Sequence, residues 1–238
     1  MNTYTVKLQA RAEVADRTMT FHFEKPAGFV YKPGQAIDLA LPEPAGGEPL
    51  VHTFSLVSAP YQDELVIATR MRDSAYKRAL RALPDGAQVT LQGPSGSLTL
   101  SEKKIRPAVL LAGGIGITPF LSMLEQAAHD GSPRPLALLY SNRRPEDAAF
   151  VPELKQLAQR NPHFRLIATM TGMEQSHLPW DGDRGLVDSA KVERACAGYD
   201  DPVYYLAGPP GMVDFLRTLL ETAGVDEDDI RSEEFFGY

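Results

Sequence analysis

The chain has little cysteine, and this scarcity excludes several kinds of site. Its 238 residues contain one cysteine, Cys196. A single thiol cannot form a disulfide within the chain, nor can it supply the ligands of an iron–sulfur cluster or of a cysteine-based zinc site. We therefore expect no metal site of these kinds. A chain so poor in cysteine is typical of a reducing compartment, and we expect a cytoplasmic protein.

Long apolar runs and an excess of positive charge are also missing. No apolar run approaches the roughly 18 residues of a membrane helix. Residues 1–7 have no signal-peptide core. The formal net charge of −7 argues against nucleic acid as a partner. We expect neither a membrane span nor a nucleic-acid complex, and we expect a monomer.

The first hundred residues have the pattern of short strands between turns. β-type composition or alternation marks residues 4–8, 18–23, 36–41, 53–57, 65–68 and 88–91, and turns rich in proline and glycine separate them. One helix fits residues 74–83. Many short strands with regular turns predict a small antiparallel β-barrel.

The second half alternates strands with helices. The pattern predicts strands at 108–112, 136–140, 164–171 and 203–206, and helices at 119–129, 150–159, 189–197 and 212–223. Gly224 stands where it would end the last helix. This order predicts a parallel sheet with right-handed crossovers, whose ligands bind at the carboxyl ends of the strands. We expect two domains: an antiparallel β-barrel over residues 1–103, followed by an α/β parallel-sheet domain over residues 104–238.

Two glycine turns follow strands of this predicted sheet. The sequence Gly-Gly-Ile-Gly at 113–116 leads from a buried strand into a helix, and Ala-Gly-Pro-Pro-Gly-Met at 207–212 does the same. Glycines admit a ligand close to the backbone, and a helix start offers free N–H groups to a phosphate. Either turn alone is most simply a sharp strand-to-helix corner. Two at one sheet edge favour a dinucleotide lying across that edge.

The pattern departs from the common dinucleotide fingerprint. Residues 113–119 are not G-x-G-x-x-G, and no acid follows the second strand to bind a ribose 2′-hydroxyl. Ser141 and Arg143 lie there instead, within Ser-Asn-Arg-Arg. A hydroxyl and a guanidinium suit a 2′-phosphate. The alternative is a solvated basic loop, so the sequence leans only slightly towards NADPH over NADH.

Four motifs, in order, resemble those of the ferredoxin–NADP reductase superfamily, flavodoxin reductases included. His-Thr-Phe-Ser at 52–55 resembles its flavin motif, Arg-x-Tyr-Ser/Thr, and Gly-Pro-Ser-Gly at 93–96 resembles the turn that ends its flavin barrel. Residues 113–119 resemble its nicotinamide-nucleotide motif, and 207–212 resemble Cys-Gly-Pro-Pro-x-Met. The C-terminal residues 233–238 resemble endings of bacterial members. The resemblance covers essentially the whole chain.

This resemblance implies an FAD-binding barrel and an NAD(P)-binding domain. Such an enzyme passes hydride from NAD(P)H to FAD, and then electrons to a separate acceptor such as a ferredoxin, a flavodoxin or an oxygenase component. The preference for FAD over FMN rests on the family alone. Two alternatives stay open: an NAD(P)H:flavin reductase that uses free flavin as substrate, and a regulatory subunit that binds flavin and nucleotide without turnover.

The resemblance also assigns roles to residues. Ser55 would reach the flavin N5 edge and Phe54 would lie against the isoalloxazine, although a strand serine and a core phenylalanine are the simpler interpretations. A helix start would seat the flavin pyrophosphate, and Tyr76 would touch the adenine. The implied flavin-binding residues are His52, Thr53, Phe54, Ser55, Ala68, Thr69, Arg70, Ser74, Ala75, Tyr76 and Lys77.

A second set would bind and use the nicotinamide nucleotide. Phe235 would cover the flavin face and move for hydride transfer, and Glu233 would lie near the flavin, so both join Ser55 as catalytic candidates. A buried terminal strand and an exposed carboxylate are the alternatives. The implied nucleotide-binding residues are Gly113, Gly114, Gly116, Thr118, Pro119, Ser141, Arg143, Ala207, Gly208, Pro209 and Met212.

Two positions depart from the family pattern. His52 replaces an arginine, and histidine is mostly neutral at pH 7. Either His52 makes one hydrogen bond to the pyrophosphate, or a neighbouring cation supplies the charge; the candidates are Arg70, Arg72, Lys77 and Arg78. We expect flavin binding that is weaker and more pH-sensitive than in arginine-bearing relatives. Ala207 replaces a cysteine, and we expect turnover to survive that change.

Overall fold

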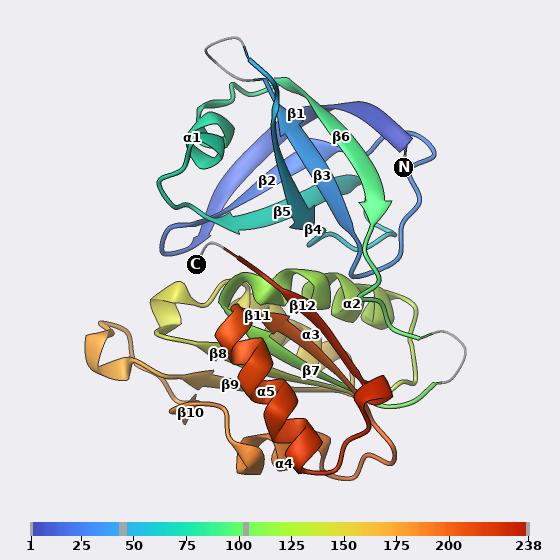
Figure 1. Cartoon of the computed structure of the whole chain (residues 1–238), viewed down its shortest axis with the longest axis vertical. Helices are drawn as coiled ribbons and strands as arrows, with labels where there is room; N and C mark the ends of the chain where they lie inside the picture. Colours follow the sequence, from blue (N-terminus) through green and yellow to red (C-terminus); the bar gives the residue numbers. More distant parts are fainter. Residues whose placement is uncertain (1, 43–46, 102–104, 237–238) are drawn as a thin grey trace.

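A computed structural model describes residues 2–42, 47–101 and 105–236. The N-terminal half is an antiparallel barrel, and the C-terminal half is a parallel sheet with helices on both faces (Figure 1). This arrangement confirms the predicted fold class. The predicted boundary between residues 103 and 104 lies outside the described residues, between the last barrel strand and the first strand of the parallel sheet.

Six strands form the barrel, in the order β4-β3-β6-β1-β2-β5. An antiparallel bridge between Leu56 and Ile67 joins the chain beyond β4 to β5 and closes the ring. Alternate side chains point inward, and Phe21, Leu39 and Leu91 are fully buried in its core. The strands are β1 (Asn2–Ala15), β2 (Thr18–Glu24), β3 (Ala36–Leu41), β4 (Leu50–Ser55), β5 (Glu64–Arg70) and β6 (Gln88–Ser95).

Strand β1 is much longer than the predicted segment 4–8. Its first half pairs with β6 and its second half pairs with β2, with a register shift between Leu8 and Ala10. A bulge of this kind bends a strand so that it can turn a barrel corner. The second half of β1 has no buried residue, and its apolar positions are mostly alanine, which is depleted in strands, so the sequence pattern did not reveal it.

Helix α1 (Ala75–Ala82) lies beside the barrel strands β3 and β4. The hydroxyl of Ser74 accepts a hydrogen bond from the Lys77 N–H, 3.2 Å away, which caps the helix. Tyr76, Lys77 and Leu80 form its buried face. The hydroxyl of Tyr76 donates to the carbonyl of Leu39 in the barrel, 2.9 Å away.

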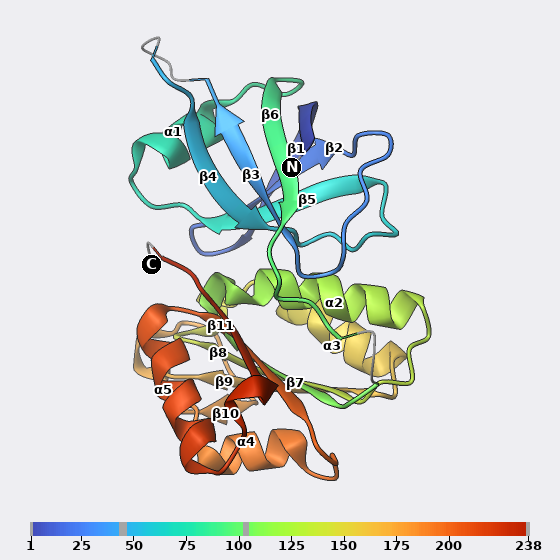
Figure 2. The same ribbon diagram turned by 45° about the vertical axis from the view of Figure 1, so that its right-hand side comes forward.

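The C-terminal sheet is parallel throughout, in the order β10-β9-β8-β7-β11-β12. Its strands are β7 (Ala108–Gly113), β8 (Leu136–Asn142), β9 (Phe164–Met170), β10 (Asp183–Arg184), β11 (Val203–Gly208) and β12 (Ile230–Glu234). The helices are α2 (Ile117–His129), α3 (Val151–Arg160), α4 (Ser189–Cys196) and α5 (Pro210–Thr222). Apolar contacts place α2 and α3 on one face of the sheet and α4 and α5 on the other (Figure 2).

The predicted strands and helices of this half are present, with β10 and β12 added. Sequence reasoning considered a terminal strand only as an alternative, because Ile-Arg-Ser-Glu-Glu has one apolar residue. Pairing with β11 makes it a strand: Tyr204 lies opposite Ile230, and Ala207 lies opposite Glu233. Gly224 follows α5 with φ at +86°, as expected of the residue that ends a helix.

Helix α2 joins the two domains by lying under the barrel (Figures 1 and 2). The hydroxyl of Ser122 donates to the carbonyl of Ser58 in the barrel, 2.7 Å away. A Cβ on Gly34 would lie 2.2 Å from the Leu98 carbonyl oxygen and 2.4 Å from the Met123 methyl carbon. Only glycine fits at this contact. The domains are therefore closely packed on the α2 side.

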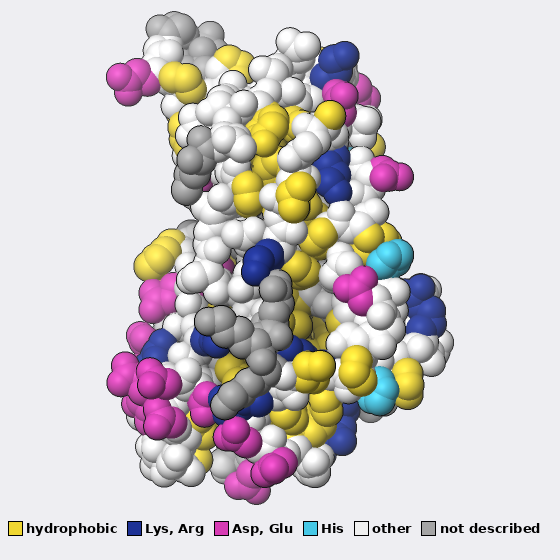
Figure 3. Space-filling model, turned by 90° about the vertical axis from the view of Figure 1, so that its right-hand side faces the viewer, with side chains coloured by type: hydrophobic (Ala, Val, Ile, Leu, Met, Phe, Trp, Pro, Cys, Tyr) yellow, Lys and Arg dark blue, Asp and Glu magenta, His cyan; other side chains and the backbone are white. Residues whose placement is uncertain are grey.

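Figure 3 shows apolar side chains at the surface of both domains and a concentration of acidic side chains on one flank of the lower domain. That flank accords with the negative net charge. Over residues 2–42, 47–101 and 105–236, no helix is long and apolar enough to cross a membrane. No group of three or more histidine, cysteine, aspartate or glutamate residues is placed to hold a metal ion within the same described ranges.

Candidate active site

Two cavities meet where the domains face each other. The larger, of about 960 Å³, follows the carboxyl edge of the parallel sheet, and the smaller, of about 330 Å³, opens on the barrel. Arg70, Arg72 and Asp73 line both. Because Arg70 ends β5 and the other two residues follow it, the end of β5 and the loop before α1 form a shared wall. Ligands in the two cavities would be neighbours.

The barrel-side cavity gathers most of the residues assigned to the flavin. Ala75 and Tyr76 are absent from its lining, because Ala75 is exposed and the Tyr76 ring packs into the barrel. Sequence reasoning missed Asp73, Ile115 and Phe236, although each adjoins a motif residue. The predicted residues that line this cavity are His52, Thr53, Phe54, Ser55, Ala68, Thr69, Arg70, Ser74, Lys77, Thr118 and Phe235.

Phe54 is both a core residue and part of the cavity wall. Its side chain is buried, and its ring packs with His52 at 4.8 Å and Tyr76 at 5.7 Å between centroids. The Lys77 ammonium lies 4.6 Å from the centroid of the Phe54 ring and donates to the Thr69 hydroxyl. An aromatic face with a cation and a hydroxyl beside it suits a planar ring system that carries a phosphate.

His52 is uncharged at neutral pH. Its partial burial, and then the positive charge of Lys77, lower its pKa below the ordinary value of 6.5. A backbone hydrogen bond with Thr53, and then the carboxylate of Asp38, oppose this only in part. The Asp38 carboxylate accepts a hydrogen bond from the Thr53 hydroxyl. His52 thus offers hydrogen bonds rather than charge. Its titration moves to a lower pH than the sequence suggested.

Ser55 of the barrel and Glu233 of the parallel-sheet domain lie side by side. The Ser55 hydroxyl donates to a Glu233 carboxyl oxygen at 3.4 Å, across the domain interface. Burial raises the pKa of Glu233, and the Ser55 hydrogen bond only partly offsets that effect. Strand β12 makes this contact possible because it carries Glu233 to the carboxyl edge of the sheet. Glu233 is not part of either cavity lining.

The C-terminal residues continue from β12 to the barrel-side cavity. The Phe235 N–H donates to the carbonyl of Gly208, 2.9 Å away, which fixes the backbone beside the second glycine turn. The Phe235 side chain is half-buried against the α2 side of the sheet. Phe236 is 76% exposed at the cavity. Phe235 therefore touches the barrel-side cavity with its ring and the nucleotide turn with its backbone.

The two glycine turns pack directly on each other. A Cβ on Gly116 would lie 2.2 Å from the Ala207 carbonyl oxygen, and a Cβ on Gly113 would lie 2.4 Å from the Met212 sulfur. A Cβ on Gly208 would lie 3.1 Å from the Gly113 Cα atom. These glycines are needed for close packing of the turns. This internal requirement was not evident from the sequence.

The remaining residues of the turns divide between the cavity and the protein interior. The larger cavity is lined by Gly113, Gly114, Pro209 and Met212, and Gly114 has φ at +52°. Since β8 and β11 flank β7 on opposite sides, the crevice lies where the strand order reverses, which is the usual ligand position. Away from the larger cavity lie Gly116, Thr118, Pro119, Ala207 and Gly208.

Ser141 and Arg143 both line the larger cavity, as predicted for a nucleotide site. Arg143 is exposed, and within the described parts of the chain no carboxylate pairs with it. Arg144 is committed elsewhere, because its guanidinium binds Asp147 at 2.8 Å and Asp16 at 3.0 Å. Of the two adjacent arginines, Arg143 is the one available to a ligand.

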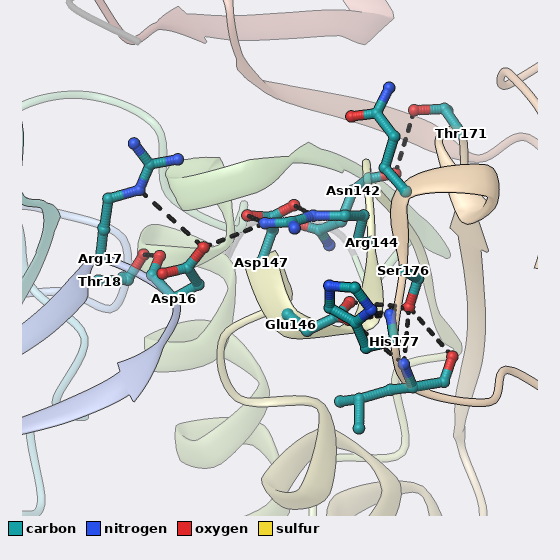
Figure 4. A network of polar contacts seen from close by, with 12 residues as sticks. Asp16, Arg17, Thr18, Asn142, Arg144, Glu146, Asp147, Thr171, Ser176 and His177 are labelled. Atoms are coloured by element: carbon teal, nitrogen blue, oxygen red, sulfur yellow. Dashed lines mark hydrogen bonds and ion pairs between the residues drawn. The ribbon is translucent and has the colours of Figure 1, made fainter.

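A network of polar contacts bridges the domains beside this cavity (Figure 4). Arg144 links Asp16 of the barrel to Asp147, and Arg70 of the barrel also binds Asp147 at 3.2 Å. The Asp147 carboxylate is buried, and hydrogen bonding to Arg144 is the largest effect that lowers its pKa. The Asp16 N–H donates to the Glu146 carbonyl at 2.7 Å. The network holds the cleft at a defined width.

Glu146 extends the network to the loop after β9. Its carboxylate accepts the His177 N–H at 2.7 Å and also the hydroxyl of Ser176 (Figure 4). Burial opposes ionisation, but the hydrogen bonds outweigh it and lower the pKa of Glu146 to about 2. The short turn Pro145–Asp147 therefore connects the barrel, the parallel sheet and this loop.

Comparison with known proteins agrees with this geometry. Residues 110–218 match the family model described as Oxidoreductase NAD-binding domain. Ferredoxin–NADP reductase B of Sorangium cellulosum is 29% identical over 227 residues, which are 92% of this chain and 91% of that protein. In its family match and over nearly its whole length, the chain is similar to the ferredoxin reductase-like superfamily of FAD/NAD(P)-binding proteins.

Two further similar proteins extend the comparison. The reductase component of propane 2-monooxygenase from Rhodococcus jostii is 30% identical over 219 residues, 89% of this chain and 57% of that protein. A ferredoxin NADP+ reductase of Neisseria gonorrhoeae, solved with bound FAD and NADP, superposes with a TM-score of 0.83 at 24% identity, over 98% of this chain and 99% of that one. The chain spans 57–61% of the length of the curated oxygenase reductases it matches.

Proposed function

We propose that this chain is an NAD(P)H-dependent FAD reductase that passes electrons to a separate protein acceptor. One observation carries the proposal: the barrel-side cavity and the sheet-edge cavity share the wall formed by Arg70, Arg72 and Asp73. A flavin in the first and a nicotinamide in the second would be adjacent, which hydride transfer requires.

The residues of the barrel-side cavity fit a flavin. Phe54 and Phe235 offer apolar faces to a planar ring, and the Ser55 hydroxyl offers a hydrogen bond at its edge. Lys77 supplies a buried cation. When bound, FAD accepts hydride from the nicotinamide and releases electrons to the acceptor. We assign the binding of its ring to Phe54 and Ser55, and the binding of its phosphates to the start of α1.

Ser55 and Glu233 have a distinct role in this proposal. The raised pKa of Glu233 lets its carboxyl group hold a proton at a pH where an exposed glutamate would be ionised. The Ser55 hydroxyl donates to the Glu233 carboxylate, and when Glu233 is protonated the hydroxyl can accept instead, which places that proton towards the cavity edge. Phe235 covers the cavity and moves aside for the nicotinamide, as a gate does.

The proposal also names an electron donor and an electron acceptor. An available guanidinium at Arg143 beside Ser141 supports NADPH as donor. The relatives include reductase components of propane 2-monooxygenase and a ferredoxin–NADP reductase, which supports an oxygenase component, a ferredoxin or a flavodoxin as acceptor. We further propose a monomer in the cytoplasm; the low cysteine content supports that compartment.

An anaerobic titration of the purified protein with NADH and with NADPH tests the proposal. We expect an oxidised flavin band in the protein as isolated, and we expect it to bleach, with NADPH the better donor. A tightly bound flavin that neither donor reduces would contradict the proposal and favour the regulatory subunit.

A second enzyme function is favoured by one observation, the uncharged His52 at the flavin motif. A weakened flavin site suits an NAD(P)H:flavin reductase that releases flavin as a product. In that case the purified protein lacks a flavin band and oxidises NAD(P)H only when FAD or FMN is added.

A further inference from the structure

Lys77 is a buried cation that lacks a carboxylate partner. Its residue is 9% exposed, and its ammonium donates to the Thr69 hydroxyl beside the Phe54 ring. Across the described ranges of the chain, no aspartate or glutamate forms an ion pair with it. Burial alone lowers the pKa of Lys77 to about 8. Lysine is rarely buried without a partner, because desolvation of the ammonium is costly.

The surroundings of Lys77 point to an anionic ligand in the cavity. The ammonium has three N–H donors, and one hydroxyl accepts from it. Helix α1 has no acidic residue in its first turn, so no side chain there neutralises its N-terminal dipole. Ser74, the cap of this helix, lines the same cavity. An anion bound here would satisfy the charge that the chain itself leaves uncompensated.

The other cations near the cavity are engaged or solvated. Arg70 binds Asp147, and Arg78, which does not line the cavity, binds the lining residue Asp73. Arg72 lines the cavity but is exposed to solvent. Within the described ranges, the remaining titratable groups that interact with Lys77 are Tyr76 on its own helix and His52 on β4, both uncharged at neutral pH.

We propose that Lys77 binds a phosphate group of the flavin, so that helix α1 supplies the positive charge that the family motif places at the position of His52. The inference rests on the proposed flavin-binding function and deepens it. It assigns to Lys77 the selection of phosphorylated flavins, FAD and FMN, over riboflavin, which has the same ring system and no phosphate. His52 then packs against Phe54 and contributes no charge.

The pH dependence of binding has a definite sign. Lys77 must be protonated to bind phosphate, and its pKa in the ligand-free protein is about 8. Affinity for FMN is therefore retained below this pH and falls as the pH rises past it. His52 adds no charge at neutral pH, because burial and the charge of Lys77 lower its pKa, so the fall in affinity past this pH is assigned to Lys77.

Flavin dissociation constants of the flavin-free protein test the proposal, measured by fluorescence for FAD, FMN and riboflavin. Lys77→Met keeps an unbranched side chain one atom shorter than lysine and removes its charge. We expect it to weaken FAD and FMN roughly tenfold or more, the value of a charge-assisted hydrogen bond, and riboflavin by less than about twofold. Arg81→Met, an equal charge change on the exposed face of the same helix, leaves all three constants unchanged.

Two further measurements complete the test. In the Lys77→Met background, His52→Arg restores affinity for FAD and FMN, because it returns the cation to the motif position. In the wild-type protein, FMN affinity falls between pH 7.5 and 9 while riboflavin affinity stays level, a measurement that needs no variant to fold.

Three results would overturn the assignment in distinguishable ways. Equal weakening of all three flavins by Lys77→Met would place Lys77 at the ring rather than at the phosphate. Unchanged affinities would assign the charge to Arg72. If the wild-type protein binds none of the three flavins, the proposed function itself fails.

Discussion

The contact between the two glycine turns makes the sharpest prediction, through a pair of glycine-to-alanine variants. At Gly116 a Cβ would lie 2.2 Å from the Ala207 carbonyl oxygen and 2.4 Å from the Ala207 carbonyl carbon. Both atoms are backbone, so no flexible side chain can move to make room. At Gly211, which lies in the first turn of α5, a Cβ would meet no atom within 4 Å.

The two variants therefore have opposite expected signs. Gly116→Ala should lower the free energy of unfolding by about 1–3 kcal/mol through overpacking, a fall of about 2–12 °C in Tm for a chain of this size. Gly211→Ala should be neutral or stabilising by up to about 1 kcal/mol, because alanine is the better helix former. Thermal unfolding followed by circular dichroism measures both.

The pair also separates packing from ligand access. Gly211 lines the larger cavity and Gly116 does not. We expect Gly116→Ala to weaken NADPH binding only indirectly, by displacing the Ala207–Gly208 backbone. If Gly116→Ala left Tm unchanged while Gly211→Ala lowered it, the close approach of the two turns would be refuted.

Three further predictions follow from the site. Glu146→Gln should reduce the free energy of unfolding at pH 7, because the Glu146 carboxylate has a pKa of about 2 in the folded protein and so stabilises it above the ordinary glutamate pKa of 4.5. The difference from wild type should shrink as the pH falls from 4.5 towards 2. Unfolding in urea across that pH range measures this difference. Arg143→Ala should raise the dissociation constant of NADPH roughly tenfold and that of NADH by less than about twofold, because NADH lacks the 2′-phosphate that Arg143 would contact. Calorimetry with each nucleotide measures both constants. Equal losses of affinity for NADPH and NADH would make Arg143 a general phosphate contact. Removal of the chain from Phe235 onward should speed reduction of the flavin by NADH relative to NADPH, and an unchanged ratio in stopped-flow kinetics would deny Phe235 its role as a gate.

Local patterns were enough to predict the architecture. Alternating apolar residues marked the barrel strands, and the glycine turns marked the carboxyl edge of the sheet. Strand β12 was not recognised as a strand because it has one apolar residue and exists by pairing with β11. Propensity cannot detect an element whose stability comes from a partner distant in sequence.

The site shows the same division between local and distant information. The motif residues at 52–55 line the barrel-side cavity, as expected. The sequence could not show that Tyr76 turns into the barrel core while Lys77, its neighbour, faces the cavity. That choice depends on which face of α1 packs on β3 and β4. Nor could it show that Gly116 meets Ala207 rather than a ligand.

The register in which β12 pairs with β11 determines where the side chains of residues 233–236 lie. The last described residues repeat in type, as Glu233-Glu234 followed by Phe235-Phe236. If β12 paired with β11 one residue out of register, Glu234 would take the place of Glu233, and Phe236 the place of Phe235. Because like replaces like, these side chains do little to oppose the wrong register. Ile230 opposes it, because it is buried opposite Tyr204 and its place would pass to Arg231. The accuracy with which Glu233 meets Ser55 thus depends on the residues before it in β12, namely the buried Ile230 and the hydrogen-bonded Arg231 and Ser232, which line neither cavity.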